Sequence, residues 1–172
     1  GDAVADLFAG SGTTLAAAQG LKRRWLGVDC SPFSLAAVRS RLIENSLGTV
    51  CFTDTHMDVS QDSIVCEAGY TQQHQRIKVE ISLLQVTNRP EGALPHEIAD
   101  WDLIDGWAAG RVEGDCFHPL KWAMRSADKP ALPRTLSIPA QMKDGLPIGV
   151  ALYDVWGRAH YFTIEQPEDA GE

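Results

Sequence analysis

Apolar positions recur with two different periods along the chain, one on each side of a polar stretch. Before residue 48, short apolar runs occupy 4–8, where Asp6 is the one exception, and 25–29, which ends in Asp29. After each run, over 13–19 and 31–45, apolar residues recur at helical spacing. A continuous apolar run is typical of a strand buried on both faces of a parallel sheet. The alternation therefore predicts a β-α-β-α unit with two parallel strands.

Helix-terminating residues support these boundaries. Gly20 stands where the first helix is expected to stop. Ser31 is a good cap for the second helix, with Pro32 in its first turn. Arg39 and Arg41 are expected to face outward from this helix. The opposite face is expected to be apolar, with Leu35, Val38, Leu42 and Ile43.

From residue 76 onward the pattern predicts strands. Apolar and polar residues alternate over 77–83, and apolar segments at 101–112, 134–138 and 148–155 are separated by Pro, Gly and Asp. A further run at 159–164 predicts a hairpin with the segment before it. This spacing is typical of a small antiparallel sandwich or barrel. Six aromatic residues fit a base-stacking surface or, as we favour, core or half-buried positions in a sheet: Trp101, Trp107, Trp122, Tyr153, Trp156 and Tyr161.

The composition is that of a globular protein. With 172 residues, 44% of them hydrophobic, the chain has room for one large domain or two small ones. No apolar run approaches the roughly 20 residues that cross a bilayer, and no secretory signal is present, so we expect no membrane partner. The four cysteines lack Cys-x-x-Cys spacing and predict free thiols in a reducing cytoplasm. The five histidines show no metal-ligand spacing, so we expect no metal site.

The net charge of −8 is unevenly distributed. Residues 1–48 hold five basic and four acidic side chains, whereas residues 49–172 hold ten basic and nineteen acidic ones. Phosphate contacts draw on Lys and Arg, so this acidity disfavours non-specific DNA binding by the second part.

The turn between the first apolar run and the first helix carries the candidate chemistry. Gly10 and Gly12 allow the backbone to approach a ligand closely, and the following helix N-terminus presents N–H groups to an anion. Seventeen residues after Gly12, the second apolar run ends in Asp29, which can accept hydrogen bonds from a ribose diol. Either feature alone is typical of an ordinary turn or cap. At this spacing the two together predict half of a nucleoside-binding site.

Three ligands compete for this site. A phosphate loop requires Lys directly after the last glycine, where Thr13 stands. A dinucleotide fingerprint is disfavoured because Leu15 stands where a third Gly or Ala is usual. The remaining ligand is S-adenosylmethionine. Its carboxylate suits a helix N-terminus, its ammonium suits Asp6 and its ribose suits Asp29.

The segment at 6–42, DLFAGSGTTLAAAQGLKRRWLGVDCSPFSLAAVRSRL, resembles the cofactor half of the DNA amino-methyltransferases of restriction-modification systems. These enzymes methylate the exocyclic amine of adenine or cytosine. Their usual motif is D-P-F-x-G-S-G-T-T, and here Leu7 replaces the proline. The resemblance implies S-adenosylmethionine as cofactor. It also implies cofactor contacts from Asp6, Phe8, Ala9, Gly10, Ser11, Gly12, Thr13 and Asp29, with Cys30 and Phe33 against the adenine.

The fold class expected from pattern and resemblance together is α/β followed by all-β. A partial Rossmann-like, S-adenosylmethionine-dependent methyltransferase domain of β-α-β-α order occupies 1–48. A polar linker covers 49–75, an antiparallel β-rich domain covers 76–165, and a disordered tail covers 166–172. Within the linker, acidic residues at four-residue spacing fit a solvated face better than a calcium loop: Asp54, Asp58 and Asp62.

The catalytic motif of the resembled family is missing. That motif is Asp/Asn/Ser-Pro-Pro-Tyr/Phe, and this sequence contains no Pro-Pro pair. Some groups of the family are circularly permuted, with the catalytic motif before the cofactor motif. The chain also lacks an initiating Met and begins almost inside its first strand. We therefore expect a fragment with no catalytic residue of its own, weak cofactor binding and undetectable methylation.

The resemblance implies double-stranded DNA as the partner, contacted mainly through the missing N-terminal part. A restriction or helicase subunit is a further partner of this kind of enzyme. Two other functions stay open: a methyltransferase acting on RNA or a small molecule, and a non-catalytic module that binds cofactor or a protein partner.

Overall fold

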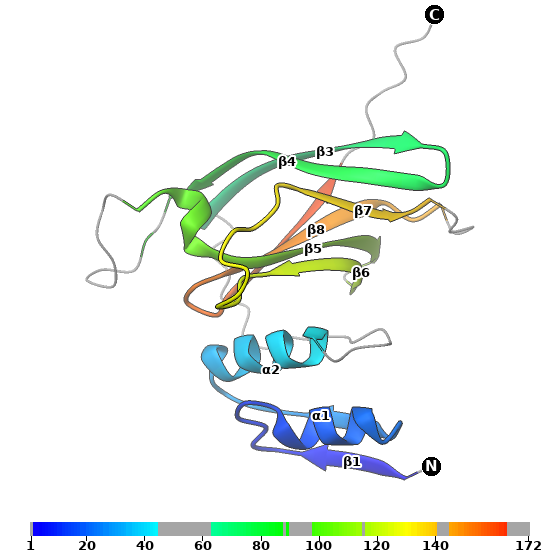
Figure 1. The fold of residues 1–172 in the computed structure, drawn as a ribbon, viewed down its shortest axis with the longest axis vertical. Helices are drawn as coiled ribbons and strands as arrows, with labels where there is room; N and C mark the ends of the chain where they lie inside the picture. The colour runs from blue at the N-terminus through cyan, green and yellow to red at the C-terminus, as the bar shows by residue number, and fades with distance from the viewer. Residues whose placement is uncertain are drawn as a thin grey trace, which may run out of the picture. The chain divides into compact units, whose positions relative to one another are not determined.

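The computed structural model describes residues 2–44, 63–87, 89, 98–114, 116–140 and 145–164 (Figure 1). Contacts group the chain into two compact units. The first unit consists of Gly1–Val50 and Tyr153–Arg158, and the second of Cys51–Leu152 and Ala159–Glu172.

The first unit has the expected β-α-β-α order: β1 (Ala3–Asp6), α1 (Thr13–Gly20), β2 (Arg24–Gly27) and α2 (Pro32–Glu44). The two strands pair in parallel, with Ala3 opposite Arg24 and Asp6 opposite Gly27. Figure 1 shows α1 lying along β1. The prediction of two parallel strands joined by a helix is confirmed.

The prediction that the first strand is buried is wrong. Side chains along β1 and β2 alternate between exposed and half-buried. The prediction assumed a parallel sheet covered on both faces. In the described part of the chain this sheet has only two strands, and its apolar residues remain in solvent: Leu26 is 59% exposed and Val28 is 48% exposed.

Close packing of α1 against β2 depends on a glycine. Leu15 and Ala18 form the buried side of α1. A Cβ atom added to Gly27 would lie 2.3 Å from Cδ1 of Leu15, so the helix can approach the strand only where no side chain is present.

The second helix buries Val38 and Leu42, as its helical spacing predicts. The expectation that Arg39 faces solvent is wrong, because its side chain is fully buried. Its guanidinium carbon lies 3.8 Å from the centre of the Tyr153 ring, within the same unit. A guanidinium over an aromatic face gains cation–π attraction, which offsets part of the loss of hydration.

The second unit is built from two antiparallel sheets, in agreement with the predicted class. In the described residues the sheet orders are β3-β4-β7 and β6-β5-β8-β9, and Figure 1 shows them as two layers. The elements are β3 (Ile64–Gln73), β4 (Arg76–Val86), the 3-10 helix η2 (Asp100–Leu103), β5 (Ile104–Glu113), β6 (Cys116–Met124), β7 (Thr135–Pro139), β8 (Ile148–Asp154) and β9 (Ala159–Ile164).

Two strands of this unit contradict the sequence-based boundaries. Residues 49–75 were expected to be a linker, but Ile64–Gln73 form β3 and pair along their whole length with β4. As the outer strand of its sheet, β3 buries only Ile64, and its other side chains are exposed or half-buried, so its apolar pattern is weaker than that of β4. Strand β6 was not predicted at all. Residues 49–62 and the expected tail at 166–172 lie outside the described residues.

The apolar pattern correctly indicates the core of this unit. In β4 the side chains of Ile77, Val79 and Ile81 are buried and their neighbours are exposed. Strand β8 is buried throughout, because it lies between β5 and β9 in its sheet. A continuous apolar run is the sequence expected for such a strand.

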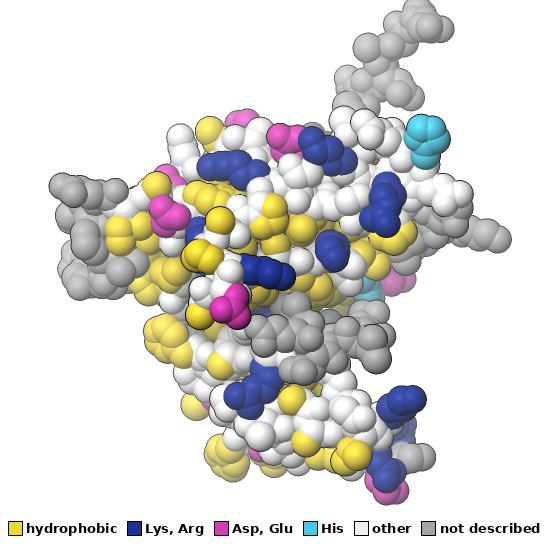
Figure 2. Space-filling view, viewed as in Figure 1, with side chains coloured by type: hydrophobic (Ala, Val, Ile, Leu, Met, Phe, Trp, Pro, Cys, Tyr) yellow, Lys and Arg dark blue, Asp and Glu magenta, His cyan; other side chains and the backbone are white. Residues whose placement is uncertain are grey.

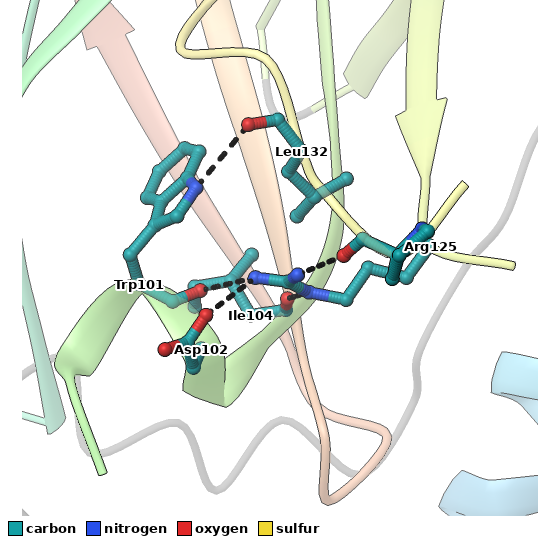
Figure 3. A network of polar contacts seen from close by, with 6 residues as sticks. Trp101, Asp102, Ile104, Arg125 and Leu132 are labelled. Atoms are coloured by element: carbon teal, nitrogen blue, oxygen red, sulfur yellow. Dashed lines mark hydrogen bonds and ion pairs between the residues drawn. The ribbon is translucent and has the colours of Figure 1, made fainter.

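Trp101 and Trp107 are held by backbone contacts. The Trp101 indole N–H donates to the carbonyl of Leu132 at 3.4 Å, and Trp107, fully buried, donates to that of Pro133 at 2.7 Å. Figure 3 shows Arg125 beside Trp101, donating from Nη2 to its carbonyl at 3.0 Å and to Asp102 at 3.2 Å. Burial excludes the base-stacking interpretation for Trp107 and also for Tyr153, which is 2% exposed.

Candidate cofactor-binding site

The loop between β1 and α1 is shaped by its own hydrogen bonds. Asp6 Oδ1 accepts a hydrogen bond from the Phe8 amide at 3.2 Å, and the Gly12 amide donates to the Ala9 carbonyl at 2.8 Å. Gly12 has a φ of 74°, in the left-handed region that favours glycine. A Cβ atom there would also lie 2.8 Å from Cγ2 of Val38. Gly12 is thus required by both the turn and the packing of α2.

Asp29 joins this loop to the loop that follows β2. Its Oδ2 accepts a hydrogen bond from the Gly10 amide at 2.7 Å, and its Oδ1 accepts one from the Ser31 amide at 2.9 Å. The strands lead into this contact: the Val28 amide donates to the Asp6 carbonyl, and the Ala9 amide donates to the Val28 carbonyl. The predicted acid and the predicted glycine turn therefore meet in the structure.

The environment of Asp29 favours its charged form. Hydrogen bonds from the Ser31 and Gly10 amides lower the pKa of Asp29 below its ordinary value of 3.8, with the Ser31 bond the larger cause. At neutral pH the site therefore contains a carboxylate. The Ser34 side chain and the Cys30 amide make smaller contributions in the same direction. Because the Asp29 side chain is exposed, a hydroxyl donor of a ligand can still reach the carboxylate.

The N-terminus of α1 has no side-chain cap. Gly12 occupies the capping position, and the first turn contains no acidic residue. The first N–H groups of a helix have no carbonyl partner within that helix, and they carry its positive dipole end. The hydroxyl oxygens of Ser11 and Thr13 lie 3.4 Å apart at this end. These donors fit an anionic group such as a carboxylate.

Arg41 is a residue of this region that the sequence interpretation missed. It is half-buried, and its Nη1 donates to the hydroxyl of Thr13. The spacing of Arg41 from Val38 on α2 could have indicated this contact. Arg41 follows Val38 by three positions, and residues three apart on a helix share a face. Since Val38 packs against Gly12, Arg41 lies on the side of α2 that meets the loop.

Phe8 and the two predicted adenine contacts, Cys30 and Phe33, are exposed. Phe33 is 63% exposed, Phe8 is 90% exposed, and Cys30 is an exposed free thiol. Such aromatic exposure contributes little to folding and leaves apolar surface accessible to a planar ligand. The structure thus links Gly10 with Asp29 and Ser11 with Thr13. Phe8, Cys30 and Phe33 are accessible to solvent, and the structure shows no contact that joins them to one another.

These geometric features lie within a recognisable family segment. Residues 1–39 match the DNA methylase family model. The methylase segment includes β1, α1, β2 and the first part of α2, and it ends two residues before Arg41. The β-rich unit lies outside this match. Comparisons with curated proteins and with solved structures give no match.

The described residues hold no group of three or more His, Cys, Asp or Glu side chains placed to bind a metal ion. Burial, with a smaller contribution from Glu67, raises the pKa of the Cys66 thiol to about 11, so this thiol is protonated at neutral pH. None of the helices in the described ranges is long and apolar enough to cross a membrane.

Proposed function

We propose that this chain carries the cofactor-binding part of an S-adenosylmethionine-dependent DNA methyltransferase that acts on the exocyclic amine of adenine or cytosine. The observation that carries the proposal is the hydrogen bond between the Gly10 amide and Asp29 Oδ2. It joins the glycine turn and the acid within the methylase segment, at residues far apart in the sequence.

The residues present fit such a cofactor. Asp6 and the backbone from Gly10 to Thr13 would hold the methionine part, with its carboxylate at the uncapped end of α1. Asp29 would accept hydrogen bonds from the ribose. Phe8, Cys30 and Phe33 would supply exposed apolar surface, with Cys30 and Phe33 against the adenine, whereas the buried Ala9 would hold the loop in place through its backbone bond to Val28.

When bound, the cofactor supplies an electrophilic methyl group. Its transfer to a weakly nucleophilic amine requires in-line orientation and removal of water, and the target base must leave the duplex. No residue of this chain is assigned to that step, because the sequence contains no Pro-Pro-aromatic motif. We place the catalytic motif, and most of the contact with double-stranded DNA, in a polypeptide segment outside these residues, in a cytoplasmic enzyme.

Basic side chains are available on the β-rich unit. Figure 2 shows Lys and Arg side chains spread over the visible face of that unit. Residues 49–172 still hold nineteen acidic and ten basic side chains, so contact with phosphate there would depend on local clusters of basic residues and not on net charge.

The assignment is tested with Asp29→Ala and S-adenosylhomocysteine. Calorimetry is expected to show about a tenfold weaker Kd, the usual result of losing a hydrogen bond to a charged group. Asp2→Ala is the matched control, because Asp2 is exposed and pairs with Arg23 away from the glycine turn. Equal affinity of the wild type and the Asp29 variant would contradict the assignment. Tighter binding of NAD or ATP than of S-adenosylhomocysteine would contradict the proposed cofactor.

A further inference from the structure

One arginine of the β-rich unit is buried without an acidic partner. Arg111 lies on β5 and is 8% exposed. Its Nη1 donates to the carbonyl of Leu146 at 2.9 Å, whereas its Nε is buried and has no hydrogen-bond partner among the described residues. None of the carboxylates in the described ranges forms an ion pair with Arg111. A buried guanidinium without a counter-charge is unfavourable, and an anion bound beside it would remove this penalty.

A histidine on the neighbouring strand belongs to the same face of the sheet. His118 of β6 is directly opposite Arg111 of β5, and residues in this relation have their side chains on one face. The Nε2 atom of His118 is also buried without a hydrogen bond, although Oε2 of Glu113 lies 3.4 Å away. Glu113 follows Arg111 by two positions on β5 and therefore belongs to this face as well. Two nitrogen atoms without hydrogen bonds thus occur on one face of the β5–β6 pair.

These donors match a phosphate group. The edge of a guanidinium that contains Nε and Nη2 carries two parallel N–H groups, which can bind two phosphate oxygens. His118, with its proton on Nε2, adds a third donor. A phosphate group has enough oxygens for all three donors, whereas a carboxylate has only two. The edge of this cluster is open to solvent, because the side chains of His118 and Glu113 are 41% and 67% exposed.

We propose that Arg111 and His118 form a phosphate-binding site on the β-rich unit, outside the methylase match. The phosphate belongs either to the backbone of a nucleic acid or to a small phosphorylated ligand. The negative charge of Glu113, beside His118, opposes a phosphate and limits its affinity. Removal of the Arg111 charge and removal of the Glu113 charge therefore have opposite effects on binding. General attraction of anions to the surface does not require Arg111 in particular.

The test is a titration of the 172-residue chain with inorganic phosphate, followed by NMR. The signals of the Arg111 Nε–H group and the His118 ring are expected to shift together and to saturate with one Kd. Arg111→Gln is expected to raise this Kd about tenfold, measured at His118. Glu113→Gln is expected to lower it about threefold, because a like charge is removed. Lys129→Gln is the control and should leave the Kd unchanged, since this exposed lysine follows the other end of β6.

Duplex DNA distinguishes the two sources of phosphate. If it shifts the Arg111 signal at a lower phosphate concentration than the free ion does, the site binds nucleic acid, and if it does not, the ligand is a small phosphorylated molecule. Absence of an Arg111 shift with both ligands overturns the proposal, and so does an equal effect of Lys129→Gln and Arg111→Gln. Should Arg111→Gln not fold, Glu113→Gln decides: a Kd that is unchanged or higher in this variant refutes the site.

Discussion

Asp29 combines a structural role with a proposed binding role. Its two carboxylate oxygens accept backbone N–H groups from two loops that follow different strands. The side chain is exposed, so a ligand can reach the lone pairs that remain. Arg41 also connects two elements, because its side chain on α2 contacts Thr13 at the N-terminal end of α1.

The first residue-scale prediction concerns pH. A pKa below 3.8 in the folded state means that the stabilising contribution of Asp29 is complete above 3.8 and is lost as pH falls through the lower, folded pKa. Asp29 therefore stays ionised between pH 7 and pH 5, and its protonation is not expected to change the Kd for S-adenosylhomocysteine in this range. The carboxyl ¹³C shift of Asp29, followed by NMR, is the direct measurement. A midpoint at or above 3.8 would show that the two backbone bonds are not made in solution.

At the scale of elements, the first unit depends on close approach of helices to loop and strand. Two glycines permit this approach, Gly12 against Val38 and Gly27 against Leu15. Both helices have one buried stripe, with Leu15 and Ala18 on α1 and Val38 and Leu42 on α2. The position of the glycine turn is thus coupled to packing. Repacking α1 would move the residues proposed to hold the cofactor.

Gly27→Ala tests this coupling. The added methyl would lie 2.3 Å from a buried Leu15 carbon, so we expect a loss of about 1–3 kcal/mol in the free energy of unfolding of the first unit. Urea unfolding followed by the NMR signals of Leu15 and Trp25 gives the measurement. Gly20→Ala is the control. A Cβ there meets nothing within 4 Å, and Ala is the better helix former, so this variant should be as stable as wild type or slightly more so.

At the scale of the whole molecule, the methylase match covers only a small part of the chain. Residues 1–39 match the DNA methylase family, and the two sheets of the second unit lie outside that match. The described residues of the β-rich part form two antiparallel sheets, with buried apolar side chains on β4, β5 and β8.

We predict that the 172-residue chain does not methylate duplex DNA. Holding an extruded base against the cofactor requires groups that this sequence does not contain, since it has no Pro-Pro-aromatic motif. Incubation with duplex DNA and S-adenosylmethionine carrying a tritiated methyl group should leave the DNA unlabelled, while an active DNA methyltransferase in parallel labels it. Robust incorporation by this chain would refute the placement of the catalytic motif outside it.

The sequence by itself determined the β-α-β-α order, the antiparallel class of the second part and the pairing of the glycine turn with Asp29. These are local features: periodicity sets the elements, and a strand–helix–strand unit brings successive loops to one edge. The alternation in β4 also marked core positions correctly, as did Trp107 and Tyr153, because burial of apolar area is largely independent of the partner. Tyr161, in contrast, is exposed.

Tertiary structure alone decided the rest. Strand β3 buries only Ile64 and ends in a polar run at 71–73, and it becomes a strand because β4 offers it a complete row of backbone partners. Arg39 is buried beside Tyr153, more than a hundred positions later in the chain. Arg41 joins the cofactor loop because α2 packs on Gly12. Each of these outcomes depends on a neighbour that is distant in sequence, and no local pattern of apolar and polar residues encodes such a neighbour.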